Sequence, residues 1–231
     1  MSDVQTAVVR EARFLSPHVR ELTLEAAPFA FAPGQWLSLR LPIGDKPPLV
    51  RAYSLANAPR VDGTLTLCFD HVEGGLGSQY LWSVEPGTHL EFTGPLGNFT
   101  LAGTTGNLIF AARYTGVVPF RAVLESLRTE TDRRVLLVCG CPSDHEAIYR
   151  DELRSWEQVT PGLTCRFVNL TDSDTLPELE ALADAADFAP FTPYVCGVRE
   201  FTLPLRNFLM ERFGFERRQV KVENYNGPSG R

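Results

Sequence analysis

The segment Arg51-Ala52-Tyr53-Ser54 carries side chains whose types and spacing could bind an anion beside an aromatic ring. An arginine at the end of a strand offers a fork of donors that matches phosphate oxygens. Because alternate residues of a strand share a face, Arg51 and Tyr53 should lie on the same side. A helix that opens at the glycine-rich segment 74–78 would direct free N–H groups at the same anion. The pattern predicts a phosphate group held from two sides.

Other reactive constellations are not indicated by the sequence. The five cysteines include no C-x-x-C pair, which favours reduced thiols over disulfides or iron–sulfur ligation. The four histidines show no H-x-H or H-E-x-x-H spacing, so no metal site is predicted. We find no Ser-His-Asp or paired-carboxylate arrangement in the sequence.

Length and charge narrow the classes of protein further. The chain has 231 residues and a formal net charge of −6 that is divided evenly between its halves, which argues against a nucleic-acid partner. No apolar run approaches the roughly 20 residues of a membrane span, and the first residues lack the features of a signal peptide. We therefore expect a soluble, cytoplasmic protein with no membrane span.

The first hundred residues predict a small antiparallel barrel or sandwich. Apolar and polar residues alternate there in short runs that are typical of strands, and turn signals rich in glycine and proline separate these runs. One short helix is expected over residues 78–84. The expected strands cover residues 6–14, 20–25, 36–41, 64–69 and 88–93.

After residue 101 the pattern changes to short apolar runs that alternate with amphipathic segments, which predicts a parallel sheet with helices on its faces. Segment 102–106 is the expected linker between two domains, residues 1–101 and 102–231. Such sheets bind ligands beyond the carboxyl ends of their strands. The expected strands cover residues 108–112, 135–139, 164–170 and 194–196, and the expected helices cover 119–129, 148–156, 176–185 and 200–213.

The order of the motifs resembles the ferredoxin-NADP reductase superfamily, from about residue 5 to about residue 226. Besides Arg51–Ser54, the resemblance rests on the segments Pro33–Trp36, Gly74–Leu81, Gly94–Phe99, Thr115–Phe120 and Cys196-Gly197. It implies an antiparallel Greek-key β-barrel that binds FAD, followed by a parallel-sheet α/β domain that binds NAD(P). It also implies an oxidoreductase that passes hydride from NAD(P)H to FAD and electrons to a separate acceptor, such as a ferredoxin, a free flavin, a quinone or an oxygenase component.

The resemblance also implies roles for individual residues. In the barrel, Tyr53 and Ser54 would contact the flavin ring, with Ser54 near its reactive nitrogen. Cys196 would lie beside the nicotinamide carbon that gives up hydride, and Tyr225 would shield the flavin. A plain closing edge strand is the alternative interpretation of Glu223-Asn224-Tyr225. The other implied cofactor-binding residues are Arg51, His71, Val72, Gly75, Gly77, Ser78, Thr115, Gly116, Pro119 and Gly197.

The second half departs from the family pattern before Thr115. Two glycines are usual there, so that the backbone can approach the dinucleotide, but this chain has Arg113 and Tyr114. Arg113 could replace backbone contacts with a charge-assisted bond to phosphate, or Tyr114 could cover the flavin and obstruct the nicotinamide. The second case would make the protein a flavin-binding redox-regulatory or electron-transfer subunit. Two smaller departures are Val198, where proline is usual, and Phe201, where methionine is common.

The choice of nicotinamide cofactor is predicted from charge. Residues 167–198 contain six acidic side chains and no lysine or arginine, and related NADP enzymes place cations in this stretch. A 2′-phosphate would be repelled there, so we expect NADH rather than NADPH. Asp172 could accept hydrogen bonds from ribose hydroxyls, although a solvated acidic helix face is an equally good interpretation.

Overall fold

The computed structural model describes residues 3–44, 47–129, 132–169 and 191–225. The chain divides into two compact units, which we call the barrel unit and the sheet unit. The barrel unit comprises Met1–Leu101 and Val118–Ser126, and the sheet unit comprises Ala102–Val117 and Leu127–Arg231. Within the described residues, no helix is long and apolar enough to cross a membrane.

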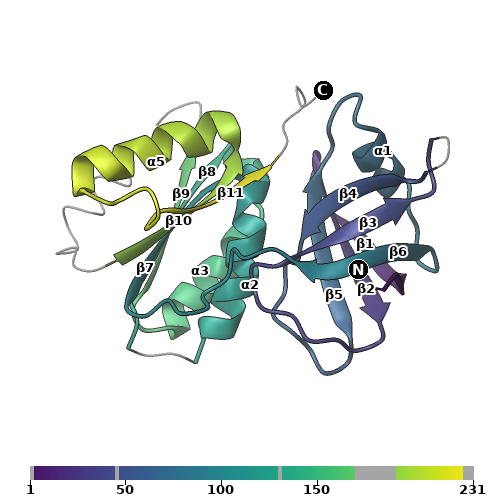
Figure 1. The fold of residues 1–231 in the computed structure, drawn as a ribbon, viewed down its shortest axis with the longest axis horizontal. Helices are drawn as coiled ribbons and strands as arrows, with labels where there is room; N and C mark the ends of the chain where they lie inside the picture. Colours follow the sequence, from purple (N-terminus) through teal and green to yellow (C-terminus); the bar gives the residue numbers. More distant parts are fainter. Residues whose placement is uncertain (1–2, 45–46, 130–131, 170–190, 226–231) are drawn as a thin grey trace. The chain divides into compact units, whose positions relative to one another are not determined.

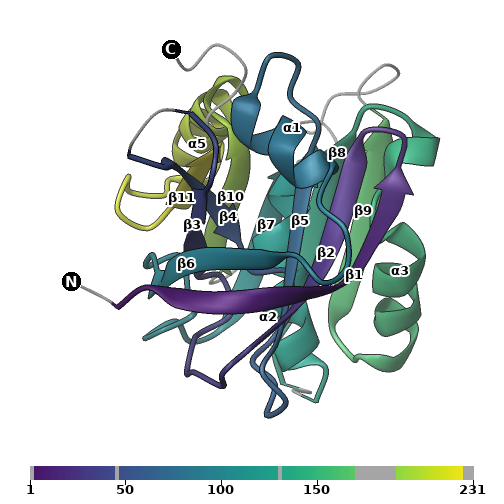
Figure 2. The same ribbon diagram turned by 90° about the vertical axis from the view of Figure 1, so that its right-hand side faces the viewer.

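The barrel unit is built on one antiparallel sheet with the order β4-β3-β6-β1-β2-β5 (Figure 2). A bridge between Leu55 and Leu67 joins the end of β4 to β5 and closes this sheet into a barrel. Because β6 lies between β3 and β1, the connections form a Greek key. The strands are β1 (Gln5–Ser16), β2 (Val19–Ala26), β3 (Trp36–Leu41), β4 (Leu49–Ser54), β5 (Thr64–Asp70) and β6 (His89–Leu96).

Alternation along the strands explains the barrel core. Leu37, Leu39 and Leu41 occupy every second position of β3, and all three are fully buried. The short helix α1 (Leu76–Trp82) begins two residues before its expected start, because the N–H of Gln79 already bonds to the carbonyl of Gly75 at 2.9 Å.

The sheet unit contains a parallel sheet with the order β11-β10-β7-β8-β9 (Figure 1). The order reverses between β7 and β10, which is where ligands bind in open parallel sheets. Strand β10 is longer than the expected segment 194–196, because Pro193 pairs with Ile109 and does not end the strand. The strands are β7 (Asn107–Arg113), β8 (Val135–Cys141), β9 (Leu163–Asn169), β10 (Phe191–Val198) and β11 (Lys221–Tyr225).

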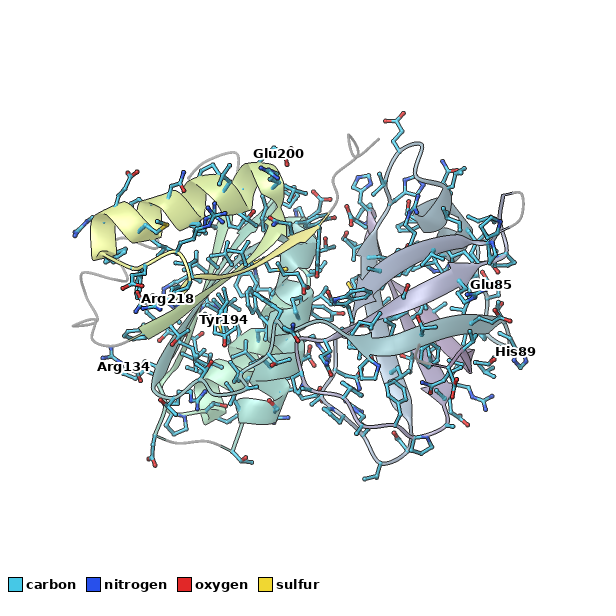
Figure 3. The ribbon with its side chains drawn as sticks, viewed as in Figure 1. Glu85, His89, Arg134, Tyr194, Glu200 and Arg218 are labelled. Atoms are coloured by element: carbon cyan, nitrogen blue, oxygen red, sulfur yellow. The ribbon has the colours of Figure 1, made fainter. Side chains whose placement is uncertain are left out.

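Helices cover both faces of the parallel sheet (Figure 1). Helix α5 (Arg199–Phe213) contributes buried residues to a core cluster that includes Leu136 and Val138 of β8. On the opposite face, α3 (Arg150–Val159) accepts a bond from the thiol of Cys165 at 3.9 Å. Tyr194 lies inside this unit (Figure 3), and its hydroxyl is 2.8 Å from Thr104. The expected helix 176–185 lies outside the described residues.

Helix α2 (Val118–Leu127) follows the short helix η1 (Tyr114–Val117), and most of it groups with the barrel unit. Arg121 is 8% exposed and donates to the carbonyl of Ala56 at 2.5 Å. Glu125 accepts from the backbone of Ala58 at 2.8 Å and pairs with Arg60 at 2.7 Å. The antiparallel barrel followed by a parallel α/β sheet confirms the predicted fold class, whereas a domain boundary near residue 101 stays a prediction.

Candidate functional site

The motif Arg51–Ser54 ends strand β4, as its position in the predicted barrel requires. A Cβ atom on Gly77 would lie 3.0 Å from Cγ of Arg51 and 3.3 Å from the hydroxyl oxygen of Tyr53. The first turn of α1 therefore packs on both side chains. Arg51 and Tyr53 lie on one face of β4, next to a backbone segment at which a larger residue than glycine would require these side chains to shift by a few tenths of an ångström.

Tyr53 presents a protonated phenol at this place. Its ring is half-buried and meets the ring of Phe69 edge-on at 5.7 Å. Burial raises the pKa of Tyr53 to about 12, against the opposing charge of Arg51. Arg51 is exposed and donates one bond to the carbonyl of Val50 at 2.8 Å, so its guanidinium retains further N–H donors. Both side chains can donate hydrogen bonds to an anionic or carbonyl-bearing ligand. Ser54, the next residue in the sequence, is buried.

Ser78 folds the glycine-rich loop rather than extending its hydroxyl away from it. Its Oγ accepts from the N–H of Val72 at 3.1 Å and lies 3.0 Å from the carbonyl of Gly75. The N–H of His71 donates to the carbonyl of His18 at 2.9 Å. The backbone N–H groups of His71 and Val72 are thus already engaged within the barrel unit, and a Cβ on Gly75 would come within 2.9 Å of Val72.

A residue that sequence reasoning missed, Arg20 of β2, holds the end of α1. It is 3% exposed and donates to the carbonyls of Leu81 at 3.2 Å and Val84 at 2.7 Å, and to that of Trp82. Its charge is paired at 3.6 Å with the exposed Glu85, labelled in Figure 3. In the sequence, the signal for this role was a charged residue within the alternating apolar and polar pattern of a strand. Arg20 fixes the helix whose first turn meets Arg51.

In the sheet unit, the turn after β7 and the end of β10 approach each other closely at two glycines, Gly116 and Gly197. A Cβ atom on Gly116 would lie 2.2 Å from the carbonyl oxygen of Cys196, which no side chain permits. Gly197 has a φ of +154°, and a Cβ there would lie 3.2 Å from Cβ of Arg113. Thr115 and Gly116 are buried. The sequence-predicted residues Thr115, Gly116, Cys196 and Gly197 therefore lie together at the carboxyl edge of the sheet.

Cys196 and Tyr225 lie on neighbouring strands, while their predicted roles at the cofactors stay predictions. Strand β11 runs parallel to β10, so that Cys196 is opposite Glu223 and Val198 is opposite Tyr225. Burial raises the pKa of the Cys196 thiol well above its usual range, and the charge of Glu223 adds to this, while a hydrogen bond with Tyr225 acts in the opposite direction. The thiol is neutral at ordinary pH. Glu223-Asn224-Tyr225 lie in the edge strand β11, and the shielding role of Tyr225 stays a prediction.

Arg113 ends β7, and Tyr114 begins the short helix η1 that follows it. Tyr114 has a φ of +51°, in the left-handed region that favours glycine. Its hydroxyl donates to Glu146 at 3.3 Å, in the short helix η2 (Asp144–Glu146) that follows β8. Because β8 and β10 flank β7 on opposite sides, Tyr114 is held away from the gap between β7 and β10. Arg113, which is exposed, borders Gly197 of β10.

Comparison with known proteins identifies the family. Residues 6–101 match the model of the oxidoreductase FAD-binding domain, and residues 114–202 match that of the oxidoreductase NAD-binding domain. The chain is 35% identical over 232 residues to ferredoxin–NADP reductase B of Sorangium cellulosum, covering 93% of this chain and 94% of that protein. The chain belongs to the ferredoxin-NADP reductase superfamily. It is by family an FAD-dependent NAD(P)H oxidoreductase.

Some of the similar proteins are longer than this chain, and others match it over nearly their whole length. The ferredoxin reductase component of 3-ketosteroid-9-alpha-monooxygenase from Rhodococcus rhodochrous is 28% identical over 87% of this chain, which spans 58% of that relative. The solved ferredoxin-NADP+ reductase of Plasmodium falciparum has the same fold, with a TM-score of 0.80, 17% identity and coverage of 95% of each chain. The Amycolatopsis cytochrome P450 reductase superposes with a TM-score of 0.81 at 22% identity, covering 98% of this chain and 71% of that one.

The barrel residues of this superfamily member fit FAD. Gly77 brings backbone close to Arg51 and Tyr53, which is the cradle that a phosphate group needs. Arg51 supplies a cation with free donors, and the protonated phenol of Tyr53 supplies a donor and a ring face. Asp172, with the rest of the acidic stretch, lies outside the described residues, so the choice between NADH and NADPH stays a prediction.

Proposed function

We propose that this chain is a reductase that accepts hydride from NADH and delivers electrons to a separate acceptor protein or small molecule. The observation that carries the proposal is the packing of Gly77 on Arg51 and Tyr53, which forms a cradle of donors in the FAD-binding domain. When bound, FAD supplies the redox chemistry by accepting a hydride and releasing electrons singly or in pairs. No side-chain general base is required.

In the barrel unit, each residue has a binding or orienting role. Arg51 would bind the pyrophosphate of FAD through its exposed guanidinium, and Gly75 and Gly77 would allow the backbone to approach it. Tyr53 and Ser54 would contact the flavin ring, as the family resemblance implies. His71 and Val72 would contact the flavin from the neighbouring segment, and Ser78 contributes by shaping the loop.

In the sheet unit, the turn after β7 binds the nicotinamide dinucleotide. Thr115, Gly116 and Gly197 would form the close approach to the dinucleotide, and Pro119 is the second residue of α2, which follows the turn. The Cys196 thiol, whose pKa burial raises, would be neutral beside the nicotinamide. Tyr225 of the edge strand would shield the flavin, as the family resemblance implies.

The position of Tyr114 favours an active reductase over a subunit with impaired nicotinamide reactivity. Its phenol is bound to Glu146 on the β8 side, whereas the ligand gap of the sheet lies between β7 and β10. Arg113 borders that gap and replaces the missing glycine contact with a charge-assisted bond to phosphate. Replacement of Arg113 and Tyr114 by glycine together should therefore lower the rate of reduction by NADH. A large gain in that rate would support the regulatory alternative.

We propose NADH rather than NADPH as the hydride donor. The acidic stretch 167–198, with Asp172 as an acceptor for ribose hydroxyls, repels a 2′-phosphate. Asp144 and Glu146 follow β8 at the same edge of the sheet and add negative charge there. The comparison of kcat/KM for the two cofactors tests this preference, and a value in favour of NADPH would contradict it.

We propose a ferredoxin or an oxygenase component as the electron acceptor. Relatives include a ferredoxin reductase component of a monooxygenase and an electron transfer component of toluate 1,2-dioxygenase. The five cysteines of the described residues are buried and form no disulfide in the structure, which fits a reducing compartment such as the cytoplasm. A screen of ferredoxins, free flavins and quinones against the NADH-reduced protein identifies the acceptor class.

A further inference from the structure

Two thiols at the carboxyl end of β8 have no role in the proposed reaction. Cys139 and Cys141 are two residues apart on one strand, so their side chains share a face. Their sulfur atoms are 3.8 Å apart, and each residue is 1% exposed. The sequence alone indicates only core packing for such cysteines. A contact between two sulfur atoms is the arrangement from which a disulfide forms.

This thiol pair also contacts the turn at residues 114–117, which we call the dinucleotide turn because we propose that it binds the nicotinamide dinucleotide. The Cys139 sulfur lies 4.0 Å from the carbonyl oxygen of Tyr114 and donates to it. Gly140, between the two cysteines, pairs with Arg113 across the sheet. Because Tyr114 holds a left-handed backbone that a non-glycine residue rarely adopts, it depends on such contacts to keep its conformation.

The two thiols differ in their readiness to ionise. The hydrogen bond to Cys141 and burial raise the pKa of Cys139 well above its usual range. The same bond lowers the pKa of Cys141, and the charge of Arg150 in α3 adds to this, against burial and the charges of Asp144 and Glu146 in η2. Cys141 is the better nucleophile of the pair, since the thiolate is the reactive form.

The strand geometry makes a disulfide here possible and easily reduced. Residues two apart in a strand have Cα atoms about 6.6–6.8 Å apart, which is the upper limit of about 6.8 Å for a disulfide. Gly140 carries no side chain, and Cys141 is the last residue of β8 before Pro142, so the strand end can shorten. Strained disulfides are more readily reduced, which suits a reversible modification.

We propose that Cys139 and Cys141 form a reversible disulfide when a peroxide oxidises them, and that this disulfide releases the carbonyl of Tyr114 and loosens the turn at 114–117. The Cys141 thiolate attacks one peroxide oxygen and breaks the O–O bond, which gives a sulfenic acid and hydroxide. The Cys139 sulfur then displaces the sulfenic oxygen as water. The two thiols lose two electrons and two protons in all, and one peroxide becomes two waters. Its effect on catalysis rests on the proposed function.

The test uses the full chain loaded with FAD and treated with hydrogen peroxide. Alkylation after denaturation and peptide mapping should find Cys139 joined to Cys141, with the other three cysteines free. Amide exchange at residues 114–117 should rise about fivefold, as for the loss of one hydrogen bond. Reduction by NADH should slow by about the same factor, and dithiothreitol should reverse all three changes.

Matched variants separate the pair from general oxidation. Cys165→Ser removes another buried thiol from the same face of the sheet and should respond as the parent does. Cys141→Ser should form no disulfide and should keep its rate with NADH through peroxide treatment. The proposal is overturned if no link between Cys139 and Cys141 forms, or if the link forms and amide exchange at 114–117 is unchanged. Failure of the untreated protein to react with NADH contradicts the proposed function instead, while mapping and exchange still decide this proposal.

Discussion

The cofactor cradle of the barrel unit and the dinucleotide turn of the sheet unit both depend on close backbone approach, but they tolerate change differently. In the turn, Gly116 is required because a Cβ would meet the carbonyl oxygen of Cys196 at 2.2 Å. Two residues earlier, Tyr114 takes a left-handed conformation at a cost of about 1–2 kcal/mol. Glycine cannot be replaced where an added Cβ would collide with a neighbouring backbone atom, as at Gly116. Where glycine is favoured only because φ is positive, as at position 114, another residue is possible if contacts such as that with Glu146 hold it.

The barrel cradle lies between these two cases. A Cβ on Gly77 would meet side-chain atoms of Arg51 and Tyr53 at 3.0 and 3.3 Å, and the Arg51 side chain is flexible. The position of α1 in this cradle depends more on Arg20, which donates hydrogen bonds to three carbonyls at the end of that helix. The barrel should therefore weaken gradually on substitution and the turn abruptly.

The largest effect is expected from Gly116→Ala. The added methyl group must displace the backbone of Cys196 or of the turn, and misplacement on that scale lowers rates by about a hundredfold or more. Rapid mixing with NADH should show this loss, while bound FAD and its absorbance are retained. Reduction by NADH at the parental rate would show that the two strand ends can separate freely.

The next effect is expected from Arg20→Met, which leaves the carbonyls at the end of α1 without their buried donor. The variant should lose about 2 kcal/mol of unfolding free energy and bind FAD more weakly, as measured by urea unfolding and flavin titration. Arg10→Met is the matched control, because Arg10 is an exposed arginine that forms an ion pair with Glu25 at 2.7 Å. Equal losses in both variants would contradict the supporting role of Arg20.

A smaller effect is expected from Gly77→Ala in the barrel cradle. Arg51 can move by a few tenths of an ångström to admit the methyl group, but its guanidinium then moves from the phosphate. The dissociation constant for FAD should rise about tenfold, which corresponds to about 1.4 kcal/mol, with little change in the rate of the bound fraction. Unchanged FAD affinity would place the phosphate elsewhere.

The smallest effect concerns the stability of the sheet unit in alkali. Burial raises the pKa of Cys165 from 9.0 to about 12, so in the folded state this thiol keeps its proton after it would be lost in the unfolded chain. The contribution of this thiol to the free energy of unfolding is fully present below pH 9 and is lost as the pH rises above 9. Between pH 9 and 10 the parent should lose about 1 kcal/mol more unfolding free energy than Cys165→Ala does. Equal slopes for the two proteins would contradict the raised pKa.

The pattern of residues predicted the fold where the physical signal was local. Strand β3 was expected at residues 36–41 and is found there, because alternation and flanking turns define it. Strand β10 is longer than expected because Pro193 is accommodated inside it. The start of α1 was misplaced because Gly75 accepts the first helical bond, which composition does not show.

Residues of the candidate site could be predicted where they belong to one short motif, but not where they depend on contacts between residues that are distant in the sequence. Arg51 and Tyr53 follow from one tetrapeptide and the period of a strand. The roles of Arg20 and Glu146 depend on partners 61 and 32 residues away in sequence, and local pattern carries no information about such pairs. The proposal that Tyr114 leaves the turn open to the dinucleotide rests on one such contact, the hydrogen bond of Tyr114 to Glu146.

The central claim is that this chain transfers hydride from NADH to bound FAD. The most direct test is the absorbance spectrum of the purified, FAD-reconstituted protein before and after addition of NADH without oxygen. Hydride transfer to bound FAD predicts a yellow protein whose flavin absorbance is bleached by NADH and returns when an electron acceptor is added. A protein that cannot be reconstituted with flavin, or whose bound flavin keeps its absorbance in excess NADH, would contradict this transfer.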